Sequence, residues 1–247
     1  MLSEIHRVLL TYLRSVKSIS LPSLLDAFRL ICQRLDNGVS EKAIIPNRDI
    51  LEEYIRDINA EITKQGFKID RKNDELNGTL YFVFTNTVCD EIIKNSTTYT
   101  VPELVTIKMI IEEIVESPDY AFSNSRIRAQ QTVSGCLNKS LKESSTFVDK
   151  LIDDGWFDAT LDDKLVLSIK SLCELKQYLI ETYGSSDSEE GKLLICPQCK
   201  ELVTLGFCTA QGEGFHRKCY DIYCRNNGLE KVQENQLSRV GPDPTTL

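Results

Sequence analysis

Residues 196–224, CPQCKELVTLGFCTAQGEGFHRKCYDIYC, hold five of the nine cysteines and one of the two histidines in the chain. Within this stretch, Cys196 and Cys199 form a C-x-x-C pair, and His216 and Cys219 form an H-x-x-C pair. Each pair places two ligands close together in the chain, and three thiolates with one imidazole suit tetrahedral zinc. We therefore predict that these four residues bind one Zn2+.

Two cysteines of this stretch lie outside the predicted site. Cys208 and Cys224 could be the remnant of a second zinc site, but that site would need two more ligands that the neighbouring sequence does not supply. Gln211 stands three residues after Cys208, where a C-x-x-C partner is expected. We interpret Cys224 as a core residue of a helix over 220–226 and leave open an incomplete second site. A redox C-x-x-C motif is a further alternative, but the βαβ context typical of such motifs is absent from the sequence pattern.

The remaining composition bears on the class of protein. No apolar run approaches the roughly 18 residues that span a bilayer, so we expect no contact with a membrane. The N-terminus lacks the apolar core of a signal peptide, so we expect reduced thiols. The isolated cysteines are predicted to be small core residues: Cys32, Cys89, Cys136 and Cys173. The net charge of −8 disfavours a sequence-independent DNA clamp and favours protein partners.

The first part of the chain, 1–93, has the pattern of three helices followed by a β-hairpin. Apolar residues recur at helical spacing over 5–16, 21–35 and 47–66, with Ser20 and Asn47 as expected N-caps. Residues 67–85 then become rich in β-branched and aromatic side chains around an Asn77-Gly78 turn. This order predicts a winged-helix domain.

The same order recurs more loosely over 94–184. Helical patterns cover 102–117, 125–137 and 141–154, and extended segments around Trp156 and over 161–167 follow them. We predict a second winged-helix domain that ends with one helix over 169–183. A polar linker then leads into a small zinc module over 185–228, and the polar residues 229–247 are predicted to form a mobile tail.

Several motifs of the chain, in this order, resemble a known family. They are Ile5-His6-Arg7, the IRDIN segment 55–59, Gly155-Trp156, the ELKQYLIETY segment 174–183 and the Cys/His pattern of 196–219. Together they resemble the RING-like first non-SMC-element subunit of the DNA-repair structural-maintenance-of-chromosomes (SMC five/six) complex. The resemblance implies an α+β, mainly helical fold in which tandem winged-helix domains precede a zinc-binding variant RING-like module.

The resemblance also implies partners and a location. These are a heterodimer with a melanoma-antigen-homology (MAGE-like) subunit, contacts to other subunits of the SMC complex, DNA contact through the complex, and a chromosome-associated place in the nucleus. A role in DNA repair and recombination follows, with RING-type ubiquitin transfer from a conjugating enzyme as an activity that the module could support. We predict no catalytic or cofactor-binding residues, since a RING acts by positioning.

The chain departs from the family pattern in its second zinc site. A RING holds one zinc with its first, second, fifth and sixth ligands, which correspond here to Cys196, Cys199, His216 and Cys219. Of the four ligands of the second zinc, only one has a clear counterpart in this chain, Cys208. One zinc ion is therefore expected, and a second remains an alternative. We therefore hypothesise that the module is mainly a structural clip on the second winged-helix domain.

Other classes of function were weighed against this interpretation. A winged-helix plus zinc-element factor would bind DNA or act in transcription without ligase activity, but the predicted third helices of both domains carry more acidic than basic side chains. A PHD-type chromatin reader commonly has a tryptophan before its last cysteines, and none follows Trp156. A metalloenzyme is disfavoured because HExxH is absent and a site with four protein ligands leaves no open position.

Overall fold

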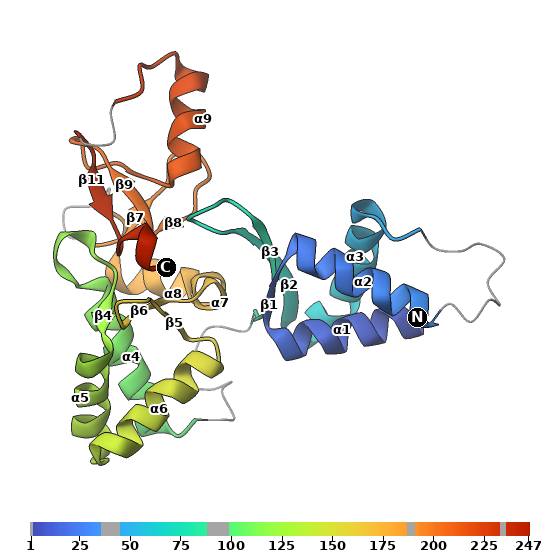
Figure 1. The fold of residues 1–247 in the computed structure, drawn as a ribbon, viewed down its shortest axis with the longest axis horizontal. Coiled ribbons are helices and arrows are strands. Elements are labelled where there is room, and N and C mark those ends of the chain that lie inside the picture. Colours follow the sequence, from blue (N-terminus) through green and yellow to red (C-terminus); the bar gives the residue numbers. More distant parts are fainter. Residues whose placement is uncertain (1, 36–44, 88–98, 187–190, 233–235) are drawn as a thin grey trace. The chain divides into compact units, whose positions relative to one another are not determined.

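A computed structural model describes residues 2–35, 45–87, 99–186, 191–232 and 236–247 (Figure 1). The chain forms two compact units. The first consists of Met1–Asp74 and Thr79–Val88, and the second consists of Glu75–Gly78 and Cys89–Leu247. The short segment Glu75–Gly78 thus groups with residues far away in the sequence. The predicted boundary at 93/94 lies outside the described residues.

The first unit contains the predicted three helices and hairpin, together with one short strand that we did not predict. Its strands form an antiparallel sheet in the order β1-β3-β2. The elements are α1 (Glu4–Val16), β1 (Ser18–Ser20), α2 (Leu21–Leu35), α3 (Arg48–Ile62), a 3-10 helix (Thr63–Gln65), β2 (Phe67–Asn73) and β3 (Leu80–Asn86).

Local sequence signals account for where these elements begin. The Asn47 side chain accepts a hydrogen bond from the Ile50 amide at 2.9 Å, which caps α3 as predicted. The Ser20 hydroxyl accepts a longer one, 3.4 Å, from the Ser23 amide at the start of α2. The apolar faces of the helices meet in one core with the sheet, where Phe28 and Phe82 are fully buried.

The second unit begins with the same order of elements as the first. Strands β4, β6 and β5 form an antiparallel sheet with β6 at its centre. The elements are α4 (Val101–Val115), a 3-10 helix (Pro118–Tyr120), β4 (Asn124–Ser125), α5 (Arg126–Leu137), α6 (Leu141–Asp153), β5 (Phe157–Ala159) and β6 (Lys164–Leu167). The predicted single helix over 169–183 is interrupted at Leu175, giving α7 (Ile169–Glu174) and α8 (Lys176–Tyr183).

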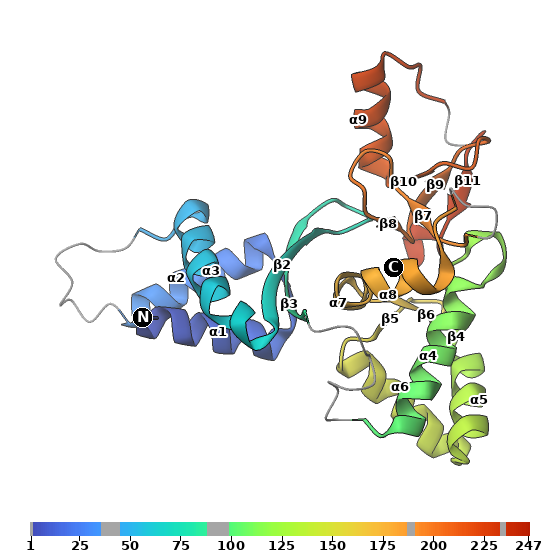
Figure 2. The same cartoon turned by 180° about the vertical axis from the view of Figure 1, so that it is seen from behind.

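Short strands and one helix form the rest of the second unit, and Figure 2 shows β7 to β11 grouped near the base of α9. Strand β9 lies between β10 and β11, and β7 pairs with β8. The elements are β7 (Leu194–Ile195), β8 (Leu202–Val203), β9 (Gly206–Cys208), β10 (Gly214–Phe215), α9 (Arg217–Asn227), β11 (Ser238–Val240) and a 3-10 helix (Pro244–Thr246).

One hydrophobic core runs through the whole second unit. It includes Ile110 and Phe157 from the predicted second domain, and Leu194 and Phe215 from the predicted zinc module. Each of these side chains is at most 1% exposed. The predicted division at 184/185 is therefore bridged by continuous apolar packing.

The prediction of a mobile tail over 229–247 was wrong for its last part. Strand β11 pairs with β9, with Val240 opposite Gly206, and the Val240 side chain is 1% exposed. The Gly241 amide also donates to the Tyr120 carbonyl at 2.8 Å. A polar three-residue strand has no recognisable period, so the sequence pattern could not reveal this pairing.

We expect Val240→Ala to lower the free energy of unfolding by about 2 kcal/mol, since it removes two buried methyl groups beside β9. Urea denaturation of the variant and the wild type would measure the difference. Val105→Ala, at a side chain that is 45% exposed on α4, is the matched control and should change stability little. Equal losses for the two variants would contradict the packing of this segment.

The isolated cysteines divide between core and surface. Cys32 is buried as predicted, whereas Cys173 is half-buried and Cys136 is exposed on α5. The prediction for Cys136 was wrong: the residue shares a helix face with the buried Thr132 and Val133 but lies one turn later, in the last turn of α5, where its side chain is exposed. Cys89 lies outside the described residues. Among the described helices, none has the length and apolar character required to span a bilayer.

Candidate metal centre

The first pair of candidate ligands lies on the turn between β7 and β8. The Cys196 amide donates to the Glu201 carbonyl, and the Lys200 amide donates back to the Cys196 carbonyl, both at 2.8 Å. Lys200 has a positive φ of 61°, which closes the turn. These bonds bend the chain so that the Cys196 and Cys199 side chains approach the same point.

The second pair lies at the start of α9. Strand β10 leads directly into His216, which is the N-cap residue of the helix, and Cys219 lies in its first turn. A helix N-terminus carries partial positive charge, which favours a thiolate at this position. The H-x-x-C spacing thus becomes a strand-to-helix junction that aims both side chains at the first pair.

The four predicted ligands come together in the structure. The ligand atoms of Cys196, Cys199, His216 and Cys219 all lie within 4.8 Å of one another. Around tetrahedral zinc, with Zn–S bonds of about 2.3 Å, ligand atoms lie roughly 3.5–4 Å apart, so a small contraction would close the shell. This group could hold a metal ion, and its three sulfurs and one nitrogen are consistent with zinc.

The two ring nitrogens of His216 have separate surroundings. Nδ1 faces the cluster, 3.4 Å from the Cys199 Sγ. Nε2 faces away and lies 2.9 Å from both the Leu202 carbonyl oxygen and the Glu75 Oε1. Because both partners of Nε2 are acceptors, Nε2 carries the proton and Nδ1 presents its lone pair to the cluster when the ring is neutral.

Interactions among the four side chains shift the pKa values of the cluster. Hydrogen bonding from Cys199 lowers the pKa of the Cys196 thiol to about 3 against the effect of burial, and raises the pKa of Cys199. Burial would lower the pKa of His216, but hydrogen bonds to Cys196 and Glu75 raise it to about 11. The lowered pKa of Cys196 favours the thiolate, which is the form of cysteine that binds a metal ion.

Cys208 and Cys224 are not part of this group. Cys208 lies on β9, where its backbone is paired with both Gly214 and Ser238. Cys224 lies on α9, is 4% exposed and belongs to the core of the second unit, as predicted. Within the described part of the chain, no second group of three or more ligands contains either cysteine.

Two residues beside the site, Glu75 and Thr204, were not identified from the sequence. Glu75 contacts His216 and also accepts hydrogen bonds from Thr204, through the backbone amide at 3.2 Å and the hydroxyl at 2.5 Å. The Glu75 side chain is 4% exposed. No local signal could have identified it, because 141 residues separate Glu75 from His216.

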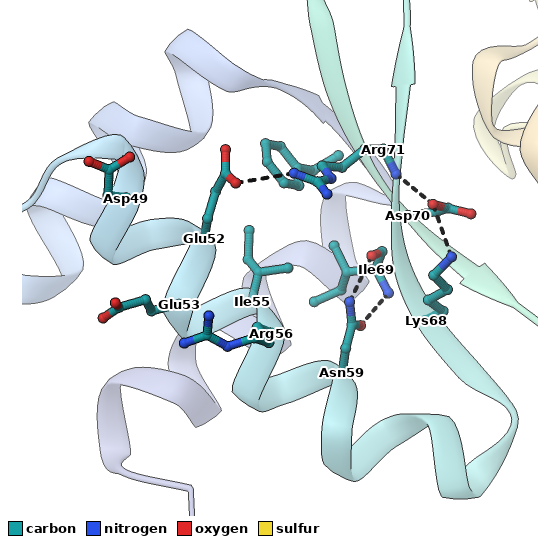
Figure 3. Close-up of a pocket in the computed structure, with 11 residues that line it drawn as sticks. Asp49, Glu52, Glu53, Ile55, Arg56, Asn59, Lys68, Ile69, Asp70 and Arg71 are labelled. Atoms are coloured by element: carbon teal, nitrogen blue, oxygen red, sulfur yellow. Dashed lines mark hydrogen bonds and ion pairs between the residues drawn. The ribbon is translucent and has the colours of Figure 1, made fainter. Parts of the chain in front are cut away.

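A groove on the first unit bears on the alternative of a DNA-binding protein. It has a volume of 570 Å³ and lies between α3 and β2, and Figure 3 shows its side chains. Arg71 is 3.1 Å from Glu52, and Lys68 is 3.2 Å from Asp70. Because these cations are paired with carboxylates, the groove is a poor surface for a phosphate backbone.

A family model and individual relatives both match this chain over most of its length. Residues 6–175, more than half of the chain, match the family model described as "Nse1 non-SMC component of SMC5-6 complex". Non-structural maintenance of chromosomes element 1 of Schizosaccharomyces pombe is 25% identical over 174 residues, which are 70% of this chain and 70% of the relative. The human homolog is 24% identical over 181 residues, 72% of this chain and 65% of the relative, a little under two thirds of its length.

A solved structure extends the similarity to nearly the whole chain. A chain of the "Nse1-Nse3-Nse4 complex" superposes with a TM-score of 0.75, at 19% identity, over 98% of this chain and 99% of that one. At this identity the match shows a shared fold. It covers 98% of this chain and so extends beyond residue 175, where the match to the family model ends.

Proposed function

Because the chain belongs to the Nse1 family of non-SMC components of the SMC5-6 complex, we propose that it is a zinc-containing subunit that pairs with an Nse3-type partner. The solved neighbour is named as a complex with Nse3 and Nse4, which supports such an assembly here. The MAGE-like subunit that the sequence resemblance implies would be this partner. The subunit would act in DNA repair and recombination on chromosomes in the nucleus.

We assign the repeated order of helix, strand, two helices and hairpin to tandem winged-helix domains. The pairing of Arg71 and Lys68 with carboxylates supports DNA contact through the complex and not through the α3 surface. The alternative of an independent DNA-binding or transcription factor is therefore disfavoured. We propose that the α3 surface contacts protein subunits of the complex instead.

The Cys/His cluster is the observation that carries the proposal for the module. We assign Cys196, Cys199, His216 and Cys219 as ligands of one structural Zn2+, which would pin the β7–β8 turn to the start of α9. When bound, the ion supplies only this crosslink, since four protein ligands leave no open position. The continuous core beneath supports a module that works as a structural clip within the second unit.

Coexpression with Nse3 and Nse4 from the same source, followed by native mass spectrometry, tests the proposal. We expect a stable complex that contains one copy of this chain and one zinc ion bound to it. A chain that remains alone under these conditions would contradict the assignment as a complex subunit. A complex without zinc would contradict the proposed site alone.

The clip hypothesis predicts that the complex does not stimulate ubiquitin transfer. A RING accelerates transfer by orienting the charged conjugating enzyme, and its docking surface normally has two zinc-pinned loops. With one such group among the described residues, we expect the purified complex to leave the rate of ubiquitin discharge from conjugating enzymes unchanged. An active RING ligase is the positive control. Strong stimulation by the complex would overturn the clip hypothesis in favour of ligase activity.

A further inference from the structure

Glu75 is a buried carboxylate that forms hydrogen bonds in the metal-site region. One oxygen, Oε1, lies 2.9 Å from His216 Nε2 and 3.2 Å from the Thr204 amide, and the other accepts the Thr204 hydroxyl at 2.5 Å. The side chain is 4% exposed, so these donors replace the water that a carboxylate requires. The two oxygens are therefore held at a fixed position behind the His216 ring.

This position is the one from which a carboxylate orients a metal-binding histidine. A ligating histidine commonly donates its second N–H to a carboxylate or carbonyl, which fixes the tautomer and raises the basicity of the ligating nitrogen. His216 has both kinds of acceptor at Nε2, the Glu75 carboxylate and the Leu202 carbonyl. Nδ1 then points to the sulfurs of the cluster.

A second contact joins the same segment to α9. At Gly78, whose φ is +65°, an added Cβ would lie 2.7 Å from the Cδ of Lys218, the residue before the ligand Cys219. The segment 75–78 thus touches the Thr204 region, His216 and the first turn of α9. Both ends of the segment contact the part of the unit that the metal would organise.

We propose that Glu75 is an outer-sphere positioning residue of the metal site, and that metal binding holds the segment 75–78 against the module. This inference rests on the proposed zinc site. It adds to that site a residue from the hairpin turn, far from the cysteine cluster in sequence. Metal occupancy and the docking of the turn are then coupled, so each stabilises the other.

The test is the zinc dissociation constant of the full chain, measured by competition with a chromophoric chelator. We expect Glu75→Ala to weaken zinc binding about 10- to 100-fold, the usual effect of removing an outer-sphere partner. Glu213→Ala is the matched control, because Glu213 is an exposed carboxylate in the same module and should leave the constant unchanged. Glu75→Gln retains the shape and should fall between the two, which covers the case that Glu75→Ala does not fold.

Two further readouts separate a positioning role from simple packing. Long-range 15N–1H NMR spectra of the zinc-loaded wild type should show His216 bound through Nδ1 with its proton on Nε2. Hydrogen exchange of the amides in 75–78 should accelerate when zinc is removed. Zinc affinities of both Glu75 variants equal to that of Glu213→Ala, or zinc bound through Nε2, would overturn the inference while leaving the zinc site intact. A wild-type chain that takes up no zinc would instead overturn the proposed function.

Discussion

Replacing Cys196 with serine is expected to abolish zinc binding and to unfold the metal-site part of the second unit. Cys196 is fully buried in the cluster, and a serine hydroxyl is a poor zinc ligand. The folding energy that such sites contribute is large, about 10 kcal/mol or more for isolated zinc fingers. Native mass spectrometry should find one zinc ion per wild-type chain and none in the variant, and thermal unfolding should begin earlier.

Cys136→Ser is the control for the change of residue type. Cys136 is exposed on α5 and belongs to no metal-binding group in the described structure, so its loss should preserve both zinc content and unfolding temperature. Zinc retained by Cys196→Ser would refute the assigned ligand set. Two zinc ions in the wild type would mean that Cys208 and Cys224 recruit ligands that the structure does not bring together.

Gly206→Ala is expected to destabilise the second unit by about 3 kcal/mol. An added Cβ would overlap the carbonyl oxygen of Phe215 and lie 3.0 Å from its carbonyl carbon. Both are backbone atoms, and β9 cannot move away because β10 and β11 pair with it on both sides. Since Phe215 precedes the ligand His216, the strain should also weaken zinc binding. Urea denaturation and chelator competition measure the two effects.

Gly135→Ala provides a control with the same chemical change. Gly135 lies inside α5, and an added Cβ there would meet no atom within 4 Å beyond its chain neighbours and the backbone of the helix itself. Alanine there should stabilise the helix by up to about 1 kcal/mol. A Gly206→Ala variant as stable as the wild type would show that the β9–β10 junction is looser than the structure indicates.

Local patterns in the sequence were sufficient for most elements of the first unit. The helical spacing of apolar residues and the Asn47 cap located α3, and the aromatic run around Phe82 located β3. The ligand set was also local, since each metal-binding pair spans four residues. The C-x-x-C pair became a hairpin turn and the H-x-x-C pair became a helix start.

Local sequence patterns were therefore enough to predict most of the helices, the longer hairpin, the family and the four candidate ligands. These depend on interactions over a few residues, which leave a period or a spacing in the chain. Three features depended on the folded unit: Glu75 contacts His216, Val240 pairs with Gly206 in β9, and the predicted second domain shares one core with the predicted zinc module. These contacts join residues that are far apart in the chain, so they leave no local period or spacing in the sequence. They form only when the folded unit buries the Glu75 carboxylate and brings β11 beside β9.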